Sequence, residues 1–291
     1  MFDTHCHLNF KRFKKNLDEV ISRAFDAGVT KIVIPGTDIT SSKKAIEIAE
    51  KYDGIYAAVG IHPHHTAKYS SSVIPDSDPE SRKDWILNQV QDDIFQIKQL
   101  LNHPKVVAVG EVGMDRHKYE DTKYEAYNID NRFLNIQKKL LRLQIELAIK
   151  HNKSLILHNR EAREDILQII EENWDNSLSG RTVFHCCEPN LELLNFAKEH
   201  NMFIGVDGDV TYDKAKQEFI KQVPFEMLVL ETDSPFILPE PLLSQKKYPN
   251  EPKNIRYVIE AVAKLKGEKV DKVEQVTTKN GTALFHMALI S

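Results

Sequence analysis

The chain has 291 residues, of which 41% are hydrophobic and 28% are charged, and this balance is typical of a globular protein with a large core. Its 39 basic and 43 acidic side chains give a formal net charge of −4, which argues against holding nucleic acid by bulk electrostatics alone. No apolar run approaches the roughly 18 residues of a membrane span, and Met1 leads straight into a predicted strand without a signal peptide. We therefore expect a cytoplasmic protein without membrane contact.

Short β-rich runs alternate along the chain with longer segments of helical spacing. We expect eight strands, at residues 2–6, 30–34, 55–60, 105–109, 154–157, 181–184, 202–206 and 227–231. The segments between them repeat apolar residues every three or four positions, as Phe133, Ile136, Leu140, Leu143 and Leu147 do. Eight repeats of strand and helix predict an α/β protein with a closed parallel TIM (β/α)8 barrel, formed as one domain by residues 1–291.

Three connections are longer than the loops of such a barrel need to be. They are residues 66–83, rich in Ser, Asp and Pro, residues 112–129, mixed in charge, and residues 234–252, which contain five prolines. Long loops on a barrel usually carry substrate contacts or a lid. Phosphate affinity would have to be local, from bound metal or from a patch such as Lys11, Arg12, Lys14 and Lys15, although a solvated helix start explains that patch equally well.

Histidine and carboxylate residues recur where the predicted strands end. Asp3, His5 and His7 alternate in the first run and therefore point to one side of an extended strand. The strand ends of a barrel converge on one mouth, so ligands that are distant in sequence meet there. The later candidates are His62, Glu111, His158, His185 and Asp233. Together they suffice for two divalent ions, and their nitrogen and oxygen atoms suit Zn, Mn, Fe or Mg without singling out one of them.

Single members of this set are weaker evidence than the set itself. One histidine after a strand is more often a capping or surface residue than a metal ligand. His64 and His65 follow His62 in the same loop, where they could be no more than polar loop residues. Cys6 alternates with the histidine pair, so we expect it to be buried towards the helical layer, and a packing role is also expected for Cys186.

Six strings in this order resemble the TatD family of metal-dependent deoxyribonucleases. They are F-D-T-H-C-H-L from residue 2, G-I-H-P-H from 60, V-G-E-V-G-M-D from 109, L-H-N-R-E-A from 157, F-H-C from 184 and E-T-D-S-P-F from 231. The resemblance extends through P-N-E-P at 249–252 to N-G-T-A-L-F at 280–285. It implies an amidohydrolase-type TIM barrel that hydrolyses the phosphodiester bonds of a DNA substrate as an exonuclease. A role in DNA degradation or repair would follow, and no obligate protein partner is evident.

Carried over by position, the resemblance implies a ligand set for two metal ions. His5 and His7 would bind one divalent ion with Asp233, His158 and His185 would bind the second, and Glu111 would bridge them. Many amidohydrolases have a carbamylated lysine on strand four instead. The glutamate at this position favours the nuclease branch.

Two segments depart from the family pattern. After His185 the family usually has an aromatic or Cys-Phe step followed by Ser or Thr and Gly, whereas this chain has C-C-E-P at 186–189. After strand seven it has V-D-G-D at 206–209, which is more acidic than usual. Both changes alter the mouth that would meet the substrate. Metal chemistry is therefore better supported than DNA as the physiological target.

The expected catalytic residues are Asp233, Glu111 and His62. Metal would lower the pKa of a bound water from about 15.7 towards about 7 to 9, and Asp233 would accept its proton before attack on phosphorus. His62 and His64 would polarise the phosphate or protonate the leaving oxygen. Arg160 would clamp a phosphate with its planar fork, or would instead form a structural salt bridge with Glu161 or Glu164.

Two other functions fit the same residues. One is a metal-dependent ester or amide hydrolase, such as an aminoacyl-tRNA deacylase, because an activated water serves either reaction. The other is a barrel that binds nucleic acid or metal without turnover. The intact set of ligand-type residues argues against this last function, because buried polar groups are unfavourable unless they are used.

Overall fold

Eight parallel strands follow one another in chain order, and each is hydrogen-bonded to the next. They are β1 Phe2–Asp3, β2 Lys31–Pro35, β3 Ile55–Val59, β4 Val106–Asp115, β5 Ser154–Arg160, β6 Thr182–Phe184, β7 Phe203–Val206 and β8 Leu228–Leu230. The backbone nitrogen and the hydroxyl of Thr4 both donate to the carbonyl oxygen of Leu230, at 3.0 and 3.1 Å, which joins the last strand to the first. The predicted TIM barrel is confirmed.

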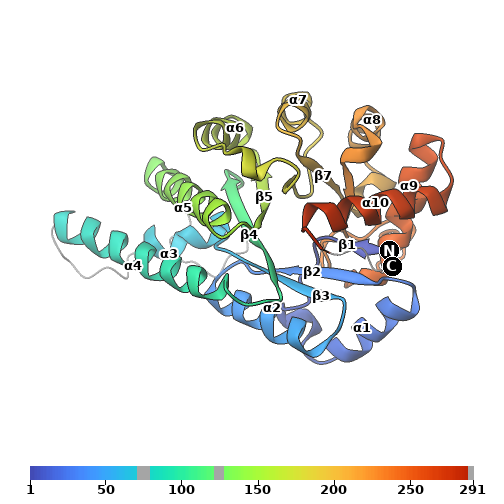
Figure 1. The fold of residues 1–291 in the computed structure, drawn as a ribbon, viewed down its shortest axis with the longest axis horizontal. Coiled ribbons are helices and arrows are strands. Elements are labelled where there is room, and N and C mark those ends of the chain that lie inside the picture. The colour runs from blue at the N-terminus through green and yellow to red at the C-terminus, as the bar shows by residue number, and fades with distance from the viewer. Residues whose placement is uncertain (71–78, 121–127, 288–291) are drawn as a thin grey trace.

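The computed structural model describes residues 1–70, 79–120 and 128–287, except for the side chains of residues 70 and 79–87. Helices lie outside the strands (Figure 1). The α-helices are α1 Leu17–Asp26, α2 Ile39–Lys51, α3 Ala67–Ser70, α4 Pro79–Leu100, α5 Asn131–Lys150, α6 Arg163–Glu172, α7 Leu191–Glu199, α8 Lys214–Gln222, α9 Ile255–Lys266 and α10 Val270–Leu284. Short 3-10 helices are η1 Lys11–Phe13, η2 Pro63–Thr66, η3 Asn176–Leu178, η4 Gly208–Thr211, η5 Phe225–Met227 and η6 Pro252–Asn254. No helix in the described ranges is long and apolar enough to cross a bilayer.

Helix α5 illustrates how the sequence pattern produces the helical layer. Its N-cap is Asp130, whose side chain accepts a hydrogen bond from the backbone nitrogen of Phe133 at 2.8 Å and so satisfies a free donor of the first turn. Its buried face contains Phe133, Ile136, Leu140 and Leu147, which pack against the strands in the main core cluster. The predicted helical spacing is therefore the spacing of the face that α5 buries.

Apolar side chains close the floor of the barrel. Inward-facing residues from six strands form a cluster with Phe2, and this cluster is capped by Leu284 and Phe285 at the end of α10. The six are Val33, Ala58, Ala108, Ile156, Val183 and Val229. The side-chain nitrogen of Asn280 donates to the carbonyl oxygens of Phe225 and Leu228, and these bonds attach α10 beneath β8. The candidate ligands lie at the opposite end, where the carboxyl ends of the strands meet.

Three strands differ clearly from their predicted bounds: β1 was expected to reach residue 6 but ends at Asp3, so His5 and His7 follow it, and β4 and β5 are longer than expected. β4 was expected to end at residue 109 and β5 at residue 157, but they continue to Asp115 and Arg160. Gly110 and Glu111 lie opposite the single residue Ile156 of β5, so β4 contains a bulge and then resumes its pairing. A bulge re-aims side chains without ending the strand. Glu111, His158 and Arg160 consequently lie within strands and not after them.

The three long connections are only partly as expected. Residues 71–78 and 121–127, which belong to the first two predicted connections, lie outside the described residues. The first connection begins at the last residue of η2 and contains α3 and the start of α4, and the second begins only after β4 ends at Asp115. The third is attached to the end of β8 by the buried Asn250, whose side-chain nitrogen donates to the carbonyl oxygens of Thr232 and Ile237 at 3.0 and 2.9 Å.

Candidate metal centre

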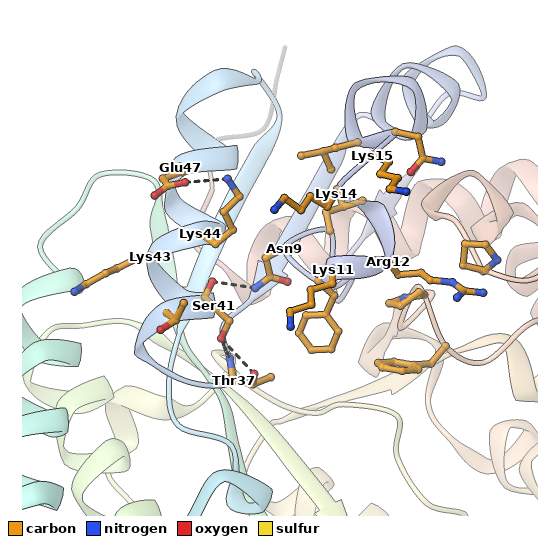
Figure 2. Close-up of a pocket in the computed structure, with 18 of the residues that line it drawn as sticks. Asn9, Lys11, Arg12, Lys14, Lys15, Thr37, Ser41, Lys43, Lys44 and Glu47 are labelled. Atoms are coloured by element: carbon orange, nitrogen blue, oxygen red, sulfur yellow. Dashed lines mark hydrogen bonds and ion pairs between the residues drawn. The ribbon is translucent and has the colours of Figure 1, made fainter. Parts of the chain in front are cut away.

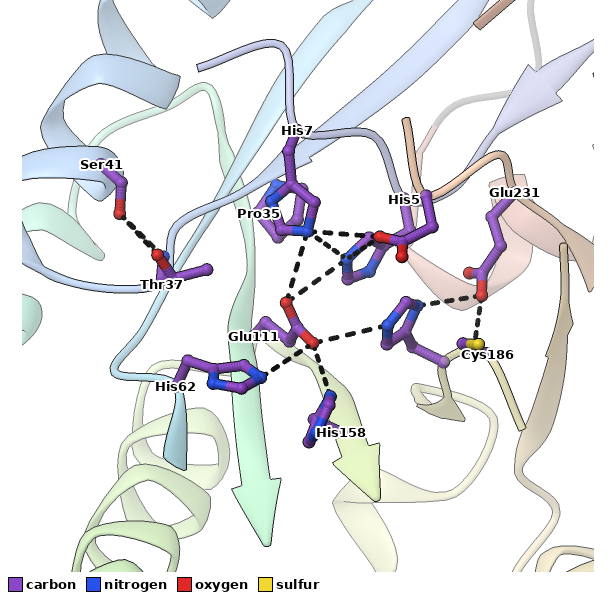
Figure 3. A network of polar contacts seen from close by, with 12 residues as sticks. His5, His7, Pro35, Thr37, Ser41, His62, Glu111, His158, Cys186 and Glu231 are labelled. Carbon is purple, nitrogen blue, oxygen red and sulfur yellow. Dashed lines mark hydrogen bonds and ion pairs between the residues drawn. The ribbon is translucent and has the colours of Figure 1, made fainter. Parts of the chain in front are cut away.

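The carboxylate of Glu111 lies at the middle of a group of histidines at the carboxyl ends of the strands (Figure 3). Glu111 sits in the β4 bulge, is buried to 3% exposure, and donates its backbone N–H to the carbonyl oxygen of Gly36 at 2.8 Å. β4 also pairs with β3 and β5, so this hydrogen bond to the residue after β2 is a further contact that holds the bulge in place. The side chain is thus fixed in the mouth by backbone contacts on both sides.

The two oxygens of Glu111 face two different sets of ring nitrogens. Oε2 is 3.5 Å from the Nε2 atoms of both His5 and His7. Oε1 faces three further histidines, at distances of 2.9 Å to His158 Nδ1, 3.4 Å to His185 Nε2 and 3.4 Å to His62 Nε2. A carboxylate with one oxygen towards each of two nitrogen sets has the arrangement needed to bridge two cations.

Asp233 completes the His5 and His7 side. Its Oδ1 is 3.3 Å from His7 Nε2 and 3.7 Å from His5 Nε2, and the two Nε2 atoms are 3.2 Å apart. Backbone hydrogen bonds from Asp233 to His5 and from His7 to Ser234 fix this geometry, at 3.0 and 2.7 Å. Oδ1 of Asp233 is buried without a hydrogen-bond partner within the described residues. A cation would satisfy this oxygen, so the site fits a divalent metal.

His158 and His185 are each held by a carboxylate on the side away from Glu111. His158 Nε2 is 3.1 Å from Asp115 Oδ2, and His185 Nδ1 is 3.0 Å from Glu231 Oε1. Carboxylates in this position fix the ring orientation and the tautomer of a metal-binding histidine. The sequence reasoning missed both acids, although Asp115 ends V-G-E-V-G-M-D and Glu231 begins E-T-D-S-P-F.

Asp3 has a different neighbourhood from the one its alternation with His5 and His7 predicted. Its oxygens accept hydrogen bonds from the backbone nitrogen and the hydroxyl of Thr232, at 3.0 and 2.7 Å. Asp3 is fully buried, and burial raises its pKa to about 8 despite these bonds. It therefore attaches the end of β8, next to Asp233, to β1.

The charges of the centre are strongly coupled. Burial would raise the pKa of Glu111, but the surrounding histidines hold it well below its usual value, so this group is ionised. Burial lowers the pKa of His158, yet Asp115 and Glu111 outweigh burial and raise it to about 9. In His185 the charges of Glu231 and Glu111 likewise outweigh burial and raise the pKa to about 10. Cations that bind these nitrogens would displace protons.

At this centre, three groups of side chains bring ligand atoms within 4.8 Å of one another and could each hold a metal ion. They are His5, His7 and Glu111; His62, Glu111 and His158; and His5, His185 and Glu231. Together with Asp233, whose Oδ1 faces His5 and His7, the six predicted ligands lie around one centre. The grouping of the histidines differs from the predicted one. His62 lies with His158 and Glu111, whereas the ring of His185, the predicted partner of His158, stacks on His5 with centroids 3.6 Å apart. His62 keeps a lowered pKa, chiefly through burial, and its Nδ1 accepts from the backbone nitrogen of His64 at 3.0 Å.

Arg160 and His64 meet at Tyr119, a residue that the sequence reasoning did not single out. Arg160 Nη1 donates to the Tyr119 hydroxyl at 3.1 Å, and this hydroxyl donates to Asp115 at 2.8 Å. The His64 ring contacts the Tyr119 ring edge-on, with centroids 4.9 Å apart. The predicted alternative partners of Arg160 are engaged elsewhere, Glu161 with His117 and Glu164 with Arg163. A chain of contacts therefore links Arg160 to the carboxylate that holds His158.

The acidic stretch after β7 is balanced by a buried lysine. Lys216 of α8 is 2% exposed, and its Nζ lies 3.2 Å from Asp209 Oδ2 and donates to the carbonyl oxygen of Cys187 at 2.7 Å. Burial and the neighbouring Asp207 raise the pKa of Asp209 to about 9. Cys6 is fully buried in the core as predicted, but Cys186 is partly exposed and lies beside these acids, not in apolar packing.

Comparison with known proteins matches the chain to a family model described as TatD related DNase, over residues 2–286. The uncharacterized metal-dependent hydrolase YabD of Bacillus subtilis is 34% identical over 289 residues, which cover 99% of each chain. The 3'-5' ssDNA/RNA exonuclease TatD of Salmonella typhimurium is 28% identical over 291 residues, again 99% of each. The crystal structure of YjjV, a TatD homolog from Escherichia coli, superposes with a TM-score of 0.79 at 27% identity and covers 99% of this chain and 98% of that one.

Proposed function

Because this chain belongs to the family of TatD-related DNases, which makes it a metal-dependent hydrolase, we propose that it hydrolyses the phosphodiester bonds of nucleic acid as an exonuclease. The observation that carries the proposal is the position of Glu111, with one oxygen towards His5 and His7 and the other towards His158 and His185. The TatD exonuclease of Salmonella typhimurium, which acts on single-stranded DNA and RNA, supports this substrate class.

We assign two divalent cations to the centre. His5, His7 and Asp233 would hold one, His158 and His185 the other, and Glu111 both, while Asp115 and Glu231 keep the second histidine pair in orientation. Nitrogen and carboxylate ligands suit Mg, Mn or Zn. When bound, such cations lower the pKa of water from about 15.7 towards about 7 to 9 and neutralise phosphate oxygens.

The residues of the chain then have separate tasks in hydrolysis. Asp233 accepts the proton of the attacking water, because its Oδ1 faces the centre and is not hydrogen-bonded within the described residues. His62 donates through Nε2, since its Nδ1 already accepts from the His64 backbone, and it can polarise the phosphate or protonate the leaving oxygen. Arg160 binds a phosphate beside Tyr119, and His64 lies against the same ring.

Metal-reconstituted protein tests this proposal. Protein stripped of metal and reloaded with Mg²⁺, Mn²⁺ or Zn²⁺ should release mononucleotides from end-labelled single strands, and label position gives the polarity. Aminoacyl esters and lactones serve as the rival substrates. Glu111→Gln keeps the shape of the side chain but removes the bridging charge, so the rate should fall more than about tenfold, or 1.4 kcal/mol in barrier. If Glu111→Gln kept more than about a tenth of the wild-type rate, or if the wild type hydrolysed only the esters, the assignment would be refuted.

A further inference from the structure

A groove lined by basic and aromatic side chains adjoins the metal centre (Figure 2). Its volume is about 1680 Å³, and its walls are residues 8–12 and 14–19, the outer face of α2 and the connection after β8. A site for one small molecule usually has a volume of roughly 300–1,000 Å³. The groove therefore has room for an extended ligand.

The groove is positively charged although the chain as a whole is negative. Seven basic side chains line it against four acidic ones, whereas the whole chain has a net charge of −4. The basic residues are Lys11, Arg12, Lys14, Lys15, Lys43, Lys44 and Lys51, and all are exposed. Figure 2 shows lysines on both walls, from η1 and its flank on one side and from α2 on the other. Basic side chains on two facing walls suit the phosphates of a polyanionic chain.

Aromatic rings connect the groove to the metal centre. Phe10 stacks on His7 with ring centroids 4.4 Å apart, and Phe236 lies 5.9 Å from Phe10 and 6.0 Å from His7. Phe236 and Tyr248, from the connection after β8, are 47% and 56% exposed, which is unusual for rings of this size. Exposed rings among lysines stack the bases of single strands, whereas the bases of a duplex are already stacked on one another.

We propose that this groove binds a single-stranded polynucleotide behind the nucleotide that occupies the metal centre. Lysines of residues 11–15 and of α2 contact its phosphates, and Phe236 and Tyr248 stack its bases. The inference rests on the proposed phosphodiesterase function and adds the path of the strand to it. The basic patch at Lys11, Arg12, Lys14 and Lys15 is thereby assigned to the substrate, and not to a solvated helix start, since η1 precedes α1 as a separate turn.

Binding without turnover is the first test. Fluorescent single strands of DNA or RNA of about 15 nucleotides, within the usual range of site sizes, are titrated in chelator with anisotropy as readout. Lys11→Glu with Lys14→Glu should weaken binding at least about tenfold and reduce the salt slope by about 1.4, at about 0.7 for each lost phosphate contact. Tyr248→Ala should weaken it about tenfold at an unchanged salt slope.

A matched control has the same charge change outside the groove. Lys264→Glu with Lys269→Glu reverses two exposed lysines at the end of α9 and just before α10, and it should bind within about twofold of the wild type. If the control and the groove variants lost the same affinity for the single strand, binding would depend only on the overall charge of the protein, and the proposal would be overturned. Equal affinity of the wild type for blunt duplex and single strand would overturn the stacking role of Tyr248 and Phe236.

Turnover separates this inference from the function on which it rests. With cation present, the ratio of kcat/KM for the long strand to that for a dinucleotide should fall at least about tenfold in the lysine variant. If the wild type cleaves the long strand and the dinucleotide, and the lysine variant has the same kcat/KM ratio, then the groove does not bind the strand, while the phosphodiesterase function is retained. If the wild type cleaves no nucleic acid while the groove variants still lose binding, the groove stands and the phosphodiesterase assignment fails.

Discussion

At the residue scale, the centre depends on carboxylates that were absent from the predicted ligand set. Asp115 is fully buried, and its Oδ2 accepts from the Tyr119 hydroxyl at 2.8 Å and contacts His158 Nε2 at 3.1 Å. Burial would raise the pKa of Asp115, but the contacts with His158 lower it to about 2, so the group remains charged. At neutral pH the negative charge of Asp115 therefore faces His158 Nε2.

Asp115→Asn should weaken metal binding while the barrel stays folded. The amide keeps the shape but loses the charge that orients the His158 ring, and losses of such partners typically cost about 10–100-fold in metal affinity. Calorimetric titration with Mn²⁺ or Zn²⁺ measures this. Glu161→Gln is the control, because Glu161 contacts His117 at the same mouth and not a proposed ligand. Unchanged affinity in the Asp115 variant would exclude its positioning role.

The sequence indicated the histidines that gather around Glu111 better than the acids that contact them. His5, His7, His158 and His185 could be proposed because histidines recurred at the ends of three predicted strands. Asp115 and Glu231 carried no such signal, since a lone acid near a strand end is ordinarily solvated. Their roles follow from distances to His158 and His185 that only the folded chain shows.

At the element scale, the bulge in β4 explains why the predicted strand ended too early. A polar Glu111 between glycines interrupts the apolar run, and this pattern is typical of a strand end. In the structure the pairing with β5 resumes at Val112, and Gly113 lies directly opposite His158. The bulge that misled the strand prediction is therefore the feature that turns Glu111 into the mouth.

Gly113→Ala should destabilise the protein and disturb the centre together. A Cβ at this position would overlap the backbone carbonyl oxygen of His158, so β4 and β5 would have to separate beside the site. We expect a loss of about 3 kcal/mol or more in unfolding free energy, together with weaker metal binding. Gly267→Ala is the matched control, because its Cβ meets nothing within 4 Å and only the left-handed conformation costs about 1–2 kcal/mol. Denaturant titration measures the unfolding free energy of both variants. Equal losses in the two would contradict the predicted overlap of the Gly113→Ala side chain with the His158 carbonyl oxygen.

The α8 helix contributes a buried charge that should be essential for stability. Lys216→Met would leave the buried Asp207 and the partly buried Asp209 without their cation, and removal of one partner from a buried pair costs about 3–5 kcal/mol. Adding Asp207→Asn should restore part of that loss, because Lys216 holds the pKa of Asp207 below its usual value despite burial, so Asp207 is the acid of the pair that carries the charge. Denaturant unfolding measures both variants. A loss below about 1 kcal/mol in the single variant would show that the acids do not depend on Lys216.

At the scale of the whole molecule, the barrel could be predicted almost completely. Eight apolar runs alternating with helical spacing allow few arrangements other than a closed parallel barrel, and the strand order β1 to β8 agrees. The groove beside the centre could not be predicted. Lys11 and Lys44 are distant in sequence, and Tyr248 lies in a proline-rich connection, so only the folded chain shows that they line one surface.

Removal of metal should lower the stability of the whole barrel, because the centre joins residues from β4, β5 and the segments after β1, β6 and β8. A ligand at 100 times its dissociation constant stabilises the native state by about 2.7 kcal/mol. For a domain of this size that corresponds to a Tm shift of about 4–5 °C. Scanning calorimetry with saturating Mn²⁺ and then with chelator measures the shift, and Glu111→Gln should show a much smaller one because the shared ligand is altered. Equal Tm values for the wild type with and without metal would mean that the proposed ligands, although brought together by the fold, do not bind the cation.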